Sequence, residues 1–461
     1  MPDASRPRRR VAAGSLERFV RSAAGGLLLR PWFDEAALRV LTQWYFPLSR
    51  GWAAALAAQG SVAAFLEALP CGRFSRRLLP GILAHAQGRE AVLQAADAHW
   101  DEAFFGDGTA TVEAEARRLR AAAALTNVRS SLLPLHMTTP LPPVAWDVEP
   151  EVAVAKRHGR RLAHPERAFE DDFEAGAVEP SRGFLTHHGV DGWVRFPAGA
   201  PCAGKKPAWA RVSAPLVAEA PAMPTLIFTH GIGMETEFTG DGRNPLRALV
   251  AAGIRIIRPE GPWHGRRRLD GSYGGEPVLA RGPGGMLDYL HAHVIEIGRL
   301  TAWARATRGG PVAIGGISLG ALTTQLAAVA ANHWPEEARP DALFLVAPSL
   351  SLSAVTFEGS LTRALGVPDA IRAAGWSLSQ IDHWRTLLEP VEAPAVPAAK
   401  TVVVIGLTDD VTLAAGGEAL VQAWKLPEKN VFRSPAGHFS TSLGLARDAR
   451  PFHRLLEILR G

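Results

Sequence analysis

Hydrophobic positions in the first part of the chain recur three and four residues apart, between polar ones. This spacing is typical of amphipathic helices, and the residues are mostly the helix formers alanine, leucine, arginine and glutamate. The segments that carry the pattern are Ser15–Arg30, Phe33–Ala58, Val62–Leu69, Gly88–Ala103 and Thr111–Ala124. Breaks are expected at Pro31, Pro47, Pro70 and Pro80. We therefore predict an all-helical N-terminal region over residues 1–135, followed by a proline-rich connector over residues 136–180.

The pattern changes after residue 180, where short apolar or β-branched runs alternate with helical stretches. The expected strands are Trp193–Phe196, Trp209–Ala214, Thr225–Thr229, Ile254–Arg258, Val312–Gly315, Ala342–Val346, Thr401–Ile405 and Val431–Arg433. The expected helices are Pro245–Ala252, Gly285–Thr307, Ala321–Ala331, Gly417–Trp424 and Asp448–Arg460. Apolar strands alternating with helices favour a mostly parallel sheet with helices on both faces. The prediction is an α/β domain over residues 181–461 with an eight-stranded sheet, whose functional groups lie at the carboxyl ends of the strands.

Composition narrows the class of protein. With 461 residues, 47% of them hydrophobic and 21% charged, the chain is ordinary for a globular protein and unlike disordered or fibrous ones. Its two cysteines, Cys71 and Cys202, exclude a disulfide framework and a four-cysteine zinc site. The longest apolar run, Gly51–Leu66, is shorter than the ~20 residues that a membrane span needs. We therefore expect a soluble, cytoplasmic protein.

The net charge of +5 is small for this length. Part of it comes from a cluster of arginines between Arg6 and Arg10, and the sequence shows no basic face with interleaved aromatic residues. Nucleic-acid binding is therefore not expected. For the N-terminal helices, the simplest role is packing against the α/β domain, and the alternative is peripheral contact with a membrane surface or a partner protein.

The clearest chemical signal follows one of the predicted strands. Gly316-Ile317-Ser318-Leu319-Gly320 matches the pattern G-x-S-x-G and lies between a predicted strand and a predicted helix. A sharp turn at this place forces the serine into a strained backbone, and glycines on either side avoid steric clashes. We interpret Ser318 as a nucleophile displayed at the top of the sheet, close to a helix N-terminus that favours negative charge.

A serine nucleophile needs a base, and the base needs an orienting group. Asp409 and Asp410 follow one later predicted strand, and His438 follows the next. The order serine, acid, histidine is the one expected when the nucleophile occupies such a strand–helix turn. We predict that His438 accepts the proton of Ser318 and that Asp409 orients the imidazole, with Asp410 as the alternative acid.

A second element of the expected site begins at an apolar strand and runs into His230-Gly231-Ile232-Gly233. Such a loop is suited to present a backbone N–H towards the nucleophile. We expect the N–H groups of Ile232 and Leu319 to form an oxyanion hole. His230 is expected to brace the loop, because His438 already fills the role of the base.

These features together resemble the α/β-hydrolase superfamily over about residues 180–461. The residues that carry the resemblance are His230, Gly231, Ser318, Asp409 and His438. The stretches Arg258–Arg267 and Ala331–Pro335 are similar to a branch of abhydrolase-domain-containing serine hydrolases. The resemblance implies cleavage of an ester, thioester or amide through an acyl-enzyme intermediate, without a cofactor. It implies nothing for the N-terminal helices, which lie outside the superfamily core.

The substrate is less well defined. His230, His264, Arg266 and Arg267 are candidate substrate-binding residues, since guanidinium groups bind carboxylates and phosphates, although a solvated basic loop is the simpler interpretation. Residues 350–397 form an insertion long enough for a lid. Its aromatic side chains either line an acyl pocket or pack the lid onto the sheet, and they include Phe357, Trp376 and Trp384.

The sequence does not indicate a metal site or a cofactor site. His187, His188, His291 and His293 lack the further ligands and the spacing of a zinc site, so no metal is expected. No phosphate-binding glycine loop or dinucleotide motif is recognisable, so no cofactor is expected. A small carboxylic ester is the expected substrate. Acyl transfer and peptide cleavage use the same triad, and a non-catalytic binding protein on this scaffold is the alternative from a different class.

Overall fold

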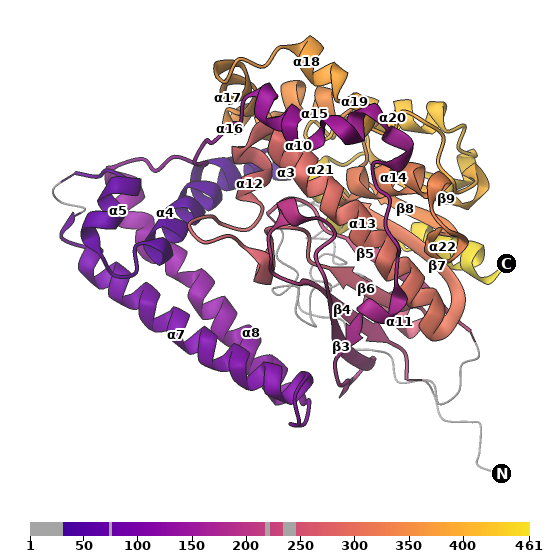
Figure 1. The fold of residues 1–461 in the computed structure, drawn as a ribbon, viewed down its shortest axis with the longest axis horizontal. Helices are drawn as coiled ribbons and strands as arrows, with labels where there is room; N and C mark the ends of the chain where they lie inside the picture. Colours follow the sequence, from indigo (N-terminus) through magenta and orange to yellow (C-terminus); the bar gives the residue numbers. More distant parts are fainter. Residues whose placement is uncertain (1–30, 73–75, 217–221, 234–245) are drawn as a thin grey trace.

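A computed structural model of the chain describes residues 31–72, 76–216, 222–233 and 246–461. The predicted helix Ser15–Arg30 and the N-terminal arginine cluster lie outside these residues. Within them, ten strands form one sheet that is covered by helices on both sides (Figure 1). The chain therefore has the predicted α/β architecture, with the N-terminal helices beside it.

The sheet combines an antiparallel edge with a parallel centre. Its strands are β1 (Glu179–Pro180), β2 (Phe184–Thr186), β3 (Gly189–Phe196), β4 (Ala208–Ala214), β5 (Met223–Thr229), β6 (Arg255–Pro259), β7 (Gly309–Ile317), β8 (Ala342–Val346), β9 (Thr401–Gly406) and β10 (Val431–Ser434). Their order is β1-β3-β4-β6-β5-β7-β8-β9-β10, with β2 paired to β3. Pairing is parallel along this order from β6 to β10, and antiparallel from β1 to β6. The eight predicted strands correspond to β3–β10, and the short β1 and β2 extend the antiparallel edge.

Helices follow the strands and fill the insertion after β8. Those of the α/β region are α11 (Arg247–Ala251), α12 (Glu276–Ala280), α13 (Gly282–Arg308), α14 (Leu319–Ala330), α20 (Ala414–Ala423), α21 (His438–Gly444) and α22 (Arg450–Arg460). Those of the insertion are α15 (Leu352–Glu358), α16 (Ser360–Leu365), α17 (Val367–Ala373), α18 (Leu378–His383) and α19 (Arg385–Leu388). The insertion occupies the predicted lid region and gathers at the top of the molecule in Figure 1. Among the helices of the described residues, none is both long and apolar enough to cross a bilayer.

Neighbouring residues of the central strands point to opposite faces of the sheet, as a period of two requires. Ile227 and Ile314 belong to the apolar core shared with α13 and α14. Leu226 and Ala313, one position earlier in each strand, belong to a second core shared with α11 and α22. Both faces are buried, which explains why these strands are mostly apolar in sequence.

The N-terminal region is helical, as predicted, but Pro47 does not break it. Its helices are α3 (Pro31–Val40), α4 (Phe46–Ala57), α5 (Val62–Ala68), α7 (Leu79–Phe104), α8 (Val112–Asn127) and α9 (Leu133–Thr138). A π-helical turn, Leu41–Tyr45, joins α3 directly to α4. Pro47 has no N–H to donate to the carbonyl of Gln43, four residues earlier. That carbonyl instead accepts from Nε2 of His136, 2.8 Å away, so its hydrogen bond is replaced from outside the helix.

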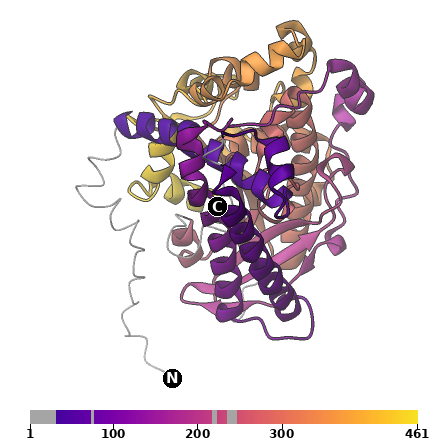
Figure 2. The same ribbon diagram turned by 90° about the vertical axis from the view of Figure 1, so that its left-hand side faces the viewer.

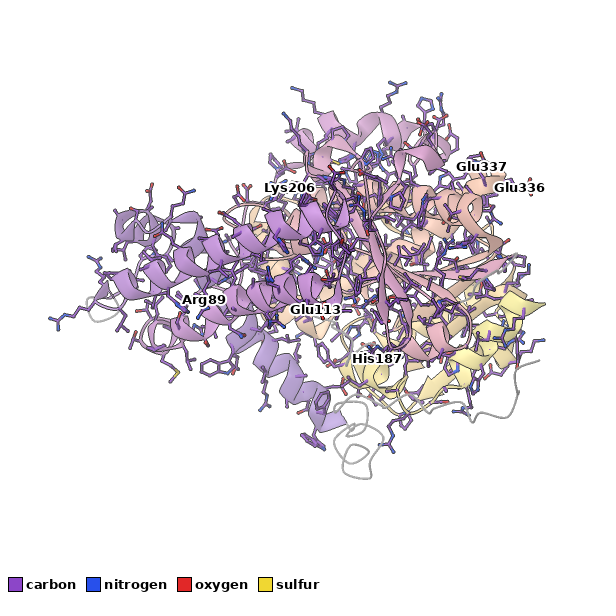
Figure 3. The ribbon with its side chains drawn as sticks, turned by 90° about the horizontal axis from the view of Figure 1, so that it is seen from below. Arg89, Glu113, His187, Lys206, Glu336 and Glu337 are labelled. Carbon is purple, nitrogen blue, oxygen red and sulfur yellow. The ribbon has the colours of Figure 1, made fainter. Side chains whose placement is uncertain are left out.

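Helices α7 and α8 form a long hairpin that projects beside the sheet in Figure 1 and lies in the foreground of Figure 2. The helix α7 begins earlier than predicted because Pro80 falls in its first turn, where a proline needs no N–H partner. The hairpin is anchored by buried Glu115, whose carboxylate accepts from the indole N–H groups of Trp100 and Trp193 at 2.6 and 3.3 Å. Its solvent side carries charged residues, of which Arg89 and Glu113 are labelled in Figure 3.

The predicted connector, residues 136–180, contains structure that its prolines did not indicate. Within it lies α10 (Glu151–Ala163), and Nε2 of His158 on this helix is 2.7 Å from the Asp288 carboxylate on α13. The hydroxyl of Tyr273 donates to the carbonyl of Pro143 at 2.9 Å. The connector therefore packs against the α/β region over part of its length.

Candidate active site

Ser318 occupies the sharp turn between β7 and α14, at the carboxyl end of a central strand. Its φ of 57° and ψ of −122° are values that residues with a side chain rarely adopt. A Cβ on Gly316 would lie 2.2 Å from Oγ1 of Thr229, and one on Gly320 would lie 2.5 Å from the Thr229 carbonyl oxygen. Both positions therefore require glycine because β5 passes close to the turn. The G-x-S-x-G pattern thus reflects the close approach of a neighbouring strand as well as the turn itself.

His438 lies at the first residue of α21 and connects Ser318 to Asp409. Its Nε2 lies 3.0 Å from Ser318 Oγ, and its Nδ1 lies 2.8 Å from Asp409 Oδ2. When Nδ1 carries the proton and donates it to the carboxylate, Nε2 has a free lone pair that accepts the Ser318 O–H. The structure brings the three predicted residues together in the arrangement of a nucleophile, a base and an orienting acid.

Asp409 is buried, and both of its carboxylate oxygens have partners. Oδ1 accepts from the N–H groups of Val411 and Thr412, each at 2.9 Å. Oδ2 accepts from the Thr412 hydroxyl at 2.8 Å in addition to His438. Burial alone would raise the pKa of Asp409, but His438 and these hydrogen bonds outweigh it and hold the pKa below its usual value. The carboxylate is therefore kept ionised beside the imidazole.

The two candidate acids after β9 have different contacts. Asp410 is exposed, and its carboxylate accepts from Oγ of Ser360 at the start of α16, 3.0 Å away. Only Asp409 of the pair is hydrogen-bonded to His438. Thr412 was not among the predicted site residues, and its hydroxyl also lies 3.3 Å from His438 Nδ1. A threonine three residues after an aspartate is common in turns, so its spacing alone indicated only a turn.

Two buried histidines form hydrogen bonds that hold the loop after β5 in place. Nδ1 of His230 donates to the Gly231 carbonyl at 2.8 Å, and its Nε2 accepts from the N–H of Gly261 at 3.0 Å. Nε2 of His264 accepts from the N–H of Gly233 at 3.4 Å. Burial lowers the pKa of His230 to about 4 and holds that of His264 well below its usual value, so each neutral ring keeps one donor and one acceptor. These contacts fit the bracing role predicted for His230.

The two predicted oxyanion donors lie beside the serine. Ile232 and Leu319 line the same cavity as Ser318. Leu319 is the first residue of α14, so its N–H has no partner within the helix. Within the described ranges, no group of three histidine, cysteine, aspartate or glutamate side chains is arranged to hold a metal ion.

A cavity of about 370 Å³ lies beside Ser318, between helices α12, α13 and α14 and the insertion. Its wall is mostly aliphatic and includes Val278, Leu279, Met286, Leu322, Leu352, Val355, Leu361, Val367, Ile371, Ile381 and Leu388. Its polar lining includes Ser351, Ser353, Asp382, Arg385 and Glu389. Aromatic side chains of the insertion are absent from this lining. Trp376 and Trp384 are buried in the packing of the insertion instead, and the indole N–H of Trp376 donates to the Glu149 carbonyl.

The remaining substrate-binding candidates lie outside the cavity lining. Arg267 is fully buried, and its Nη1 and Nη2 lie 2.8 and 2.7 Å from the Glu296 carboxylate. Burial alone would raise the pKa of Glu296, but the Arg267 guanidinium lowers it to about 2. Arg266 is stacked among three tryptophan rings, 3.9 Å from the centroid of Trp100. Both arginines therefore hold parts of the fold together, and neither is placed to meet a substrate at Ser318.

Comparisons with known proteins find similarity in structure only. No protein-family model matches the chain, and no curated protein matches it in sequence. Among solved structures, acetyl xylan esterase 1 from Thermoanaerobacterium sp. JW/SL YS485 is 16% identical, with a TM-score of 0.42 over 65% of this chain and 96% of its own. An acetyl xylan esterase from Paenibacillus sp. R4 is 14% identical, with a TM-score of 0.44 over 68% and 94% of the two chains. The acylaminoacyl peptidase of Pyrococcus horikoshii is 13% identical, with a TM-score of 0.39 over 61% and 41%.

The chain's own topology identifies its fold. Strands β5 to β10 are parallel, the serine occupies the turn between β7 and the following helix, and serine, aspartate and histidine follow one another in that order. This combination is the one found in α/β-hydrolases. The chain has the α/β-hydrolase fold, with an all-helical region at its N-terminal side.

Proposed function

We propose that this protein is a serine hydrolase that cleaves carboxylic esters with an apolar acyl group through an acyl-enzyme intermediate. The observation that supports this most directly is the line of hydrogen bonds from Ser318 to His438 and on to Asp409, 3.0 and 2.8 Å long, beside an aliphatic cavity. A binding protein would have no use for this alignment. We therefore favour the enzyme over the non-catalytic alternative.

In the first half of the reaction, Ser318 Oγ attacks the carbonyl carbon of the ester while His438 Nε2 takes the hydroxyl proton. The carbonyl oxygen becomes an oxyanion, which the N–H groups of Leu319 and Ile232 would stabilise. The C–O bond to the alcohol then breaks, and the imidazolium returns its proton to the departing alkoxide. Asp409 keeps the Nδ1 proton in place and stabilises the imidazolium while it exists.

In the second half, a water molecule takes the place of the alcohol. His438 removes one proton from the water as its oxygen attacks the acyl carbon, and the same oxyanion forms again. The bond between Ser318 Oγ and the acyl carbon breaks, and the serine recovers its proton from the imidazolium. The products are a carboxylic acid and an alcohol, and the enzyme returns to its starting state.

The cavity indicates the kind of acyl group. Most of its wall is aliphatic, and its charged lining residues Asp382, Arg385 and Glu389 come from the end of the insertion. Each methylene group buried against such a wall contributes about 0.8 kcal/mol, or roughly fourfold in kcat/KM. Activity should therefore rise with acyl length until the chain fills the cavity.

The decisive experiment is labelling with a fluorophosphonate followed by peptide mapping, on wild type, Ser318→Ala and Ser379→Ala. Ser379 is an exposed serine of the insertion and provides the matched control. We expect the label on Ser318 in the wild type and in Ser379→Ala, and none in Ser318→Ala. A folded wild type that takes no label would overturn the proposal in favour of the binding protein.

Nitrophenyl esters from acetyl to palmitoyl then test the acyl preference. We expect kcat/KM to increase along the series and to fall once the chain exceeds the cavity. A preference for acetyl over all longer chains would contradict the role given to the aliphatic wall. Anilides of the same acyl groups and added alcohols show whether the triad also acts as a peptidase or an acyltransferase.

A further inference from the structure

The helix that carries His438 is capped by a residue from the opposite end of the chain. Asp34, in the first turn of α3, accepts at Oδ1 from the N–H groups of Phe439 and Ser440, at 2.7 and 3.0 Å. Its Oδ2 accepts from the Ser440 hydroxyl. Asp34 is 8% exposed and is separated from Phe439 by 405 positions in the sequence. Figure 1 shows α3 and α21 lying next to one another.

This contact replaces a cap that α21 does not supply for itself. The residue before His438 is Gly437, which has no side chain to accept from the first turn of the helix. Asp34 takes over that function, and the Ser440 hydroxyl that donates to it accepts in turn from the N–H of Gly437 at 2.9 Å. A carboxylate at this end of the helix is also favoured by the helix dipole. The start of α21, and with it His438, is therefore fixed by Asp34.

The contact with Asp34 also explains why residue 437 is a glycine. Its φ of −87° is open to any residue, so backbone conformation does not require glycine there. A Cβ on Gly437 would lie 2.4 Å from Cγ of Asp34, and its three nearest neighbours all belong to the Asp34 side chain. The absence of a side chain before the histidine is thus what allows the carboxylate to reach the helix.

The N-terminal region touches the other half of the site as well. The hydroxyl of Tyr45, at the end of the π-helical turn after α3, donates to the Gly233 carbonyl at 3.1 Å. Gly233 directly follows Ile232, the predicted oxyanion donor. One continuous N-terminal segment therefore contacts both the helix of the base and the oxyanion loop.

We propose that Asp34 is a positioning residue of the triad, which holds His438 at the correct distance from Ser318 and Asp409. The proposal rests on the function proposed above. An isolated helix as short as α21 is unstable in water, so its first residue depends on external contacts for its position. Small displacements of a catalytic group cost on the order of 10- to 100-fold in rate.

The test compares Asp34→Ala and Asp34→Asn with Glu35→Gln, which removes an exposed carboxylate from the same turn of α3. For Asp34→Ala, normalised to the folded fraction, we expect kcat to fall on the order of 10- to 100-fold with little change in KM. Asp34→Asn keeps one oxygen acceptor for the two backbone N–H groups and loses the acceptor for Ser440, so a smaller fall is expected. Glu35→Gln should retain the wild-type kcat.

A purely structural role would lower the melting temperature and leave kcat of the folded protein unchanged, which would overturn the proposal. If Asp34→Ala does not fold, Asp34→Asn decides, and wild-type kcat in that variant would also overturn it. The ¹H resonance of the His438 Nδ1–H provides a readout without turnover, and its assignment is checked by its loss in His438→Gln. We expect this resonance to shift or broaden in Asp34→Ala. A shift in an enzyme that hydrolyses no ester would contradict the proposed function alone, and an unchanged resonance with unchanged kcat would contradict the role of Asp34.

Discussion

Replacing Asp409 by asparagine tests the orientation of His438 with a change of very few atoms. The Oδ1 position of Asp409 faces two backbone N–H groups, from Val411 and Thr412. An amide NH₂ placed there would meet two donors, so the asparagine must keep its carbonyl oxygen at this position. Its NH₂ group then occupies the place of Oδ2 and points at Nδ1 of His438.

This arrangement reverses the tautomer of the imidazole. Because the asparagine NH₂ group donates to it, Nδ1 must be the acceptor. The ring proton is then on Nε2, where it points at the hydroxyl oxygen of Ser318. The base is then unable to accept the serine proton. Such a change in a triad aspartate costs on the order of 10⁴-fold in kcat, which corresponds to about 5 kcal/mol of transition-state stabilisation.

Asp410→Asn is the matched control, because it makes the same chemical change one residue along the chain, at an exposed carboxylate bonded to Ser360. The assay is ester hydrolysis under saturating conditions, with active sites counted by fluorophosphonate titration. We expect Asp409→Asn to lose nearly all activity and Asp410→Asn to stay within about twofold of the wild type. Loss of activity in Asp410→Asn with little effect of Asp409→Asn would refute the assignment of the acid and the argument from hydrogen-bond geometry.

Further predictions concern stability. Gly320→Ala places a Cβ 2.5 Å from the backbone carbonyl oxygen of Thr229, so thermal melts should show a loss of about 1–3 kcal/mol, and an unchanged melting temperature would contradict this packing. Gly88→Ala, on the exposed side of α7 with no atom within 4 Å of the added Cβ, should instead gain about 0.5–1 kcal/mol. Because burial lowers the pKa of His230 from 6.5 to about 4, the unfolded chain binds this proton first as the pH falls, and the stability that depends on the neutral ring is lost between pH 6.5 and 4. In urea denaturation at pH 7 and pH 5, His230→Gln should therefore lose less unfolding free energy across this step than the wild type, and an equal loss would speak against a buried neutral His230.

The fold was predictable where local patterns coincide with long-range burial. Strands β5 to β9 are mostly apolar on both faces because both faces of the sheet are covered, and this pattern stands out in the sequence. The proline signals were less reliable, since their effect depends on contacts from elsewhere. Pro47 stays within a helical segment because Nε2–H of His136, from α9, donates to the Gln43 carbonyl in place of the missing N–H of the proline. The helix α10 lies within a stretch whose prolines indicated only a connector.

The candidate site divides in the same way. Ser318, Asp409 and His438 each follow a strand, and parallel strands bring their carboxyl ends to one edge of the sheet, so their sequence positions were sufficient to predict their meeting. The contact of Arg267 could not be predicted from its position after a strand. Its partner, Glu296, lies on α13, and only the packing of that helix decides whether the guanidinium faces a substrate or a buried carboxylate.

The division into an N-terminal helical region and an α/β region leaves out the polar contacts that join the two. As sequence, they carry no motif and end far from any reacting group. In the fold, Arg50 on α4 pairs with buried Glu276 at 3.0 Å, Tyr45 holds the turn after Ile232, and Asp34 caps the helix of His438. Removing one partner of a buried charged group is costly, so the Arg50–Glu276 pair and the Asp34 cap oppose separation of these helices from the α/β region. Under the proposed roles, the geometry of the site depends on two segments far apart in the chain, and a carboxylate more than 400 positions from His438 is part of what aligns its imidazole.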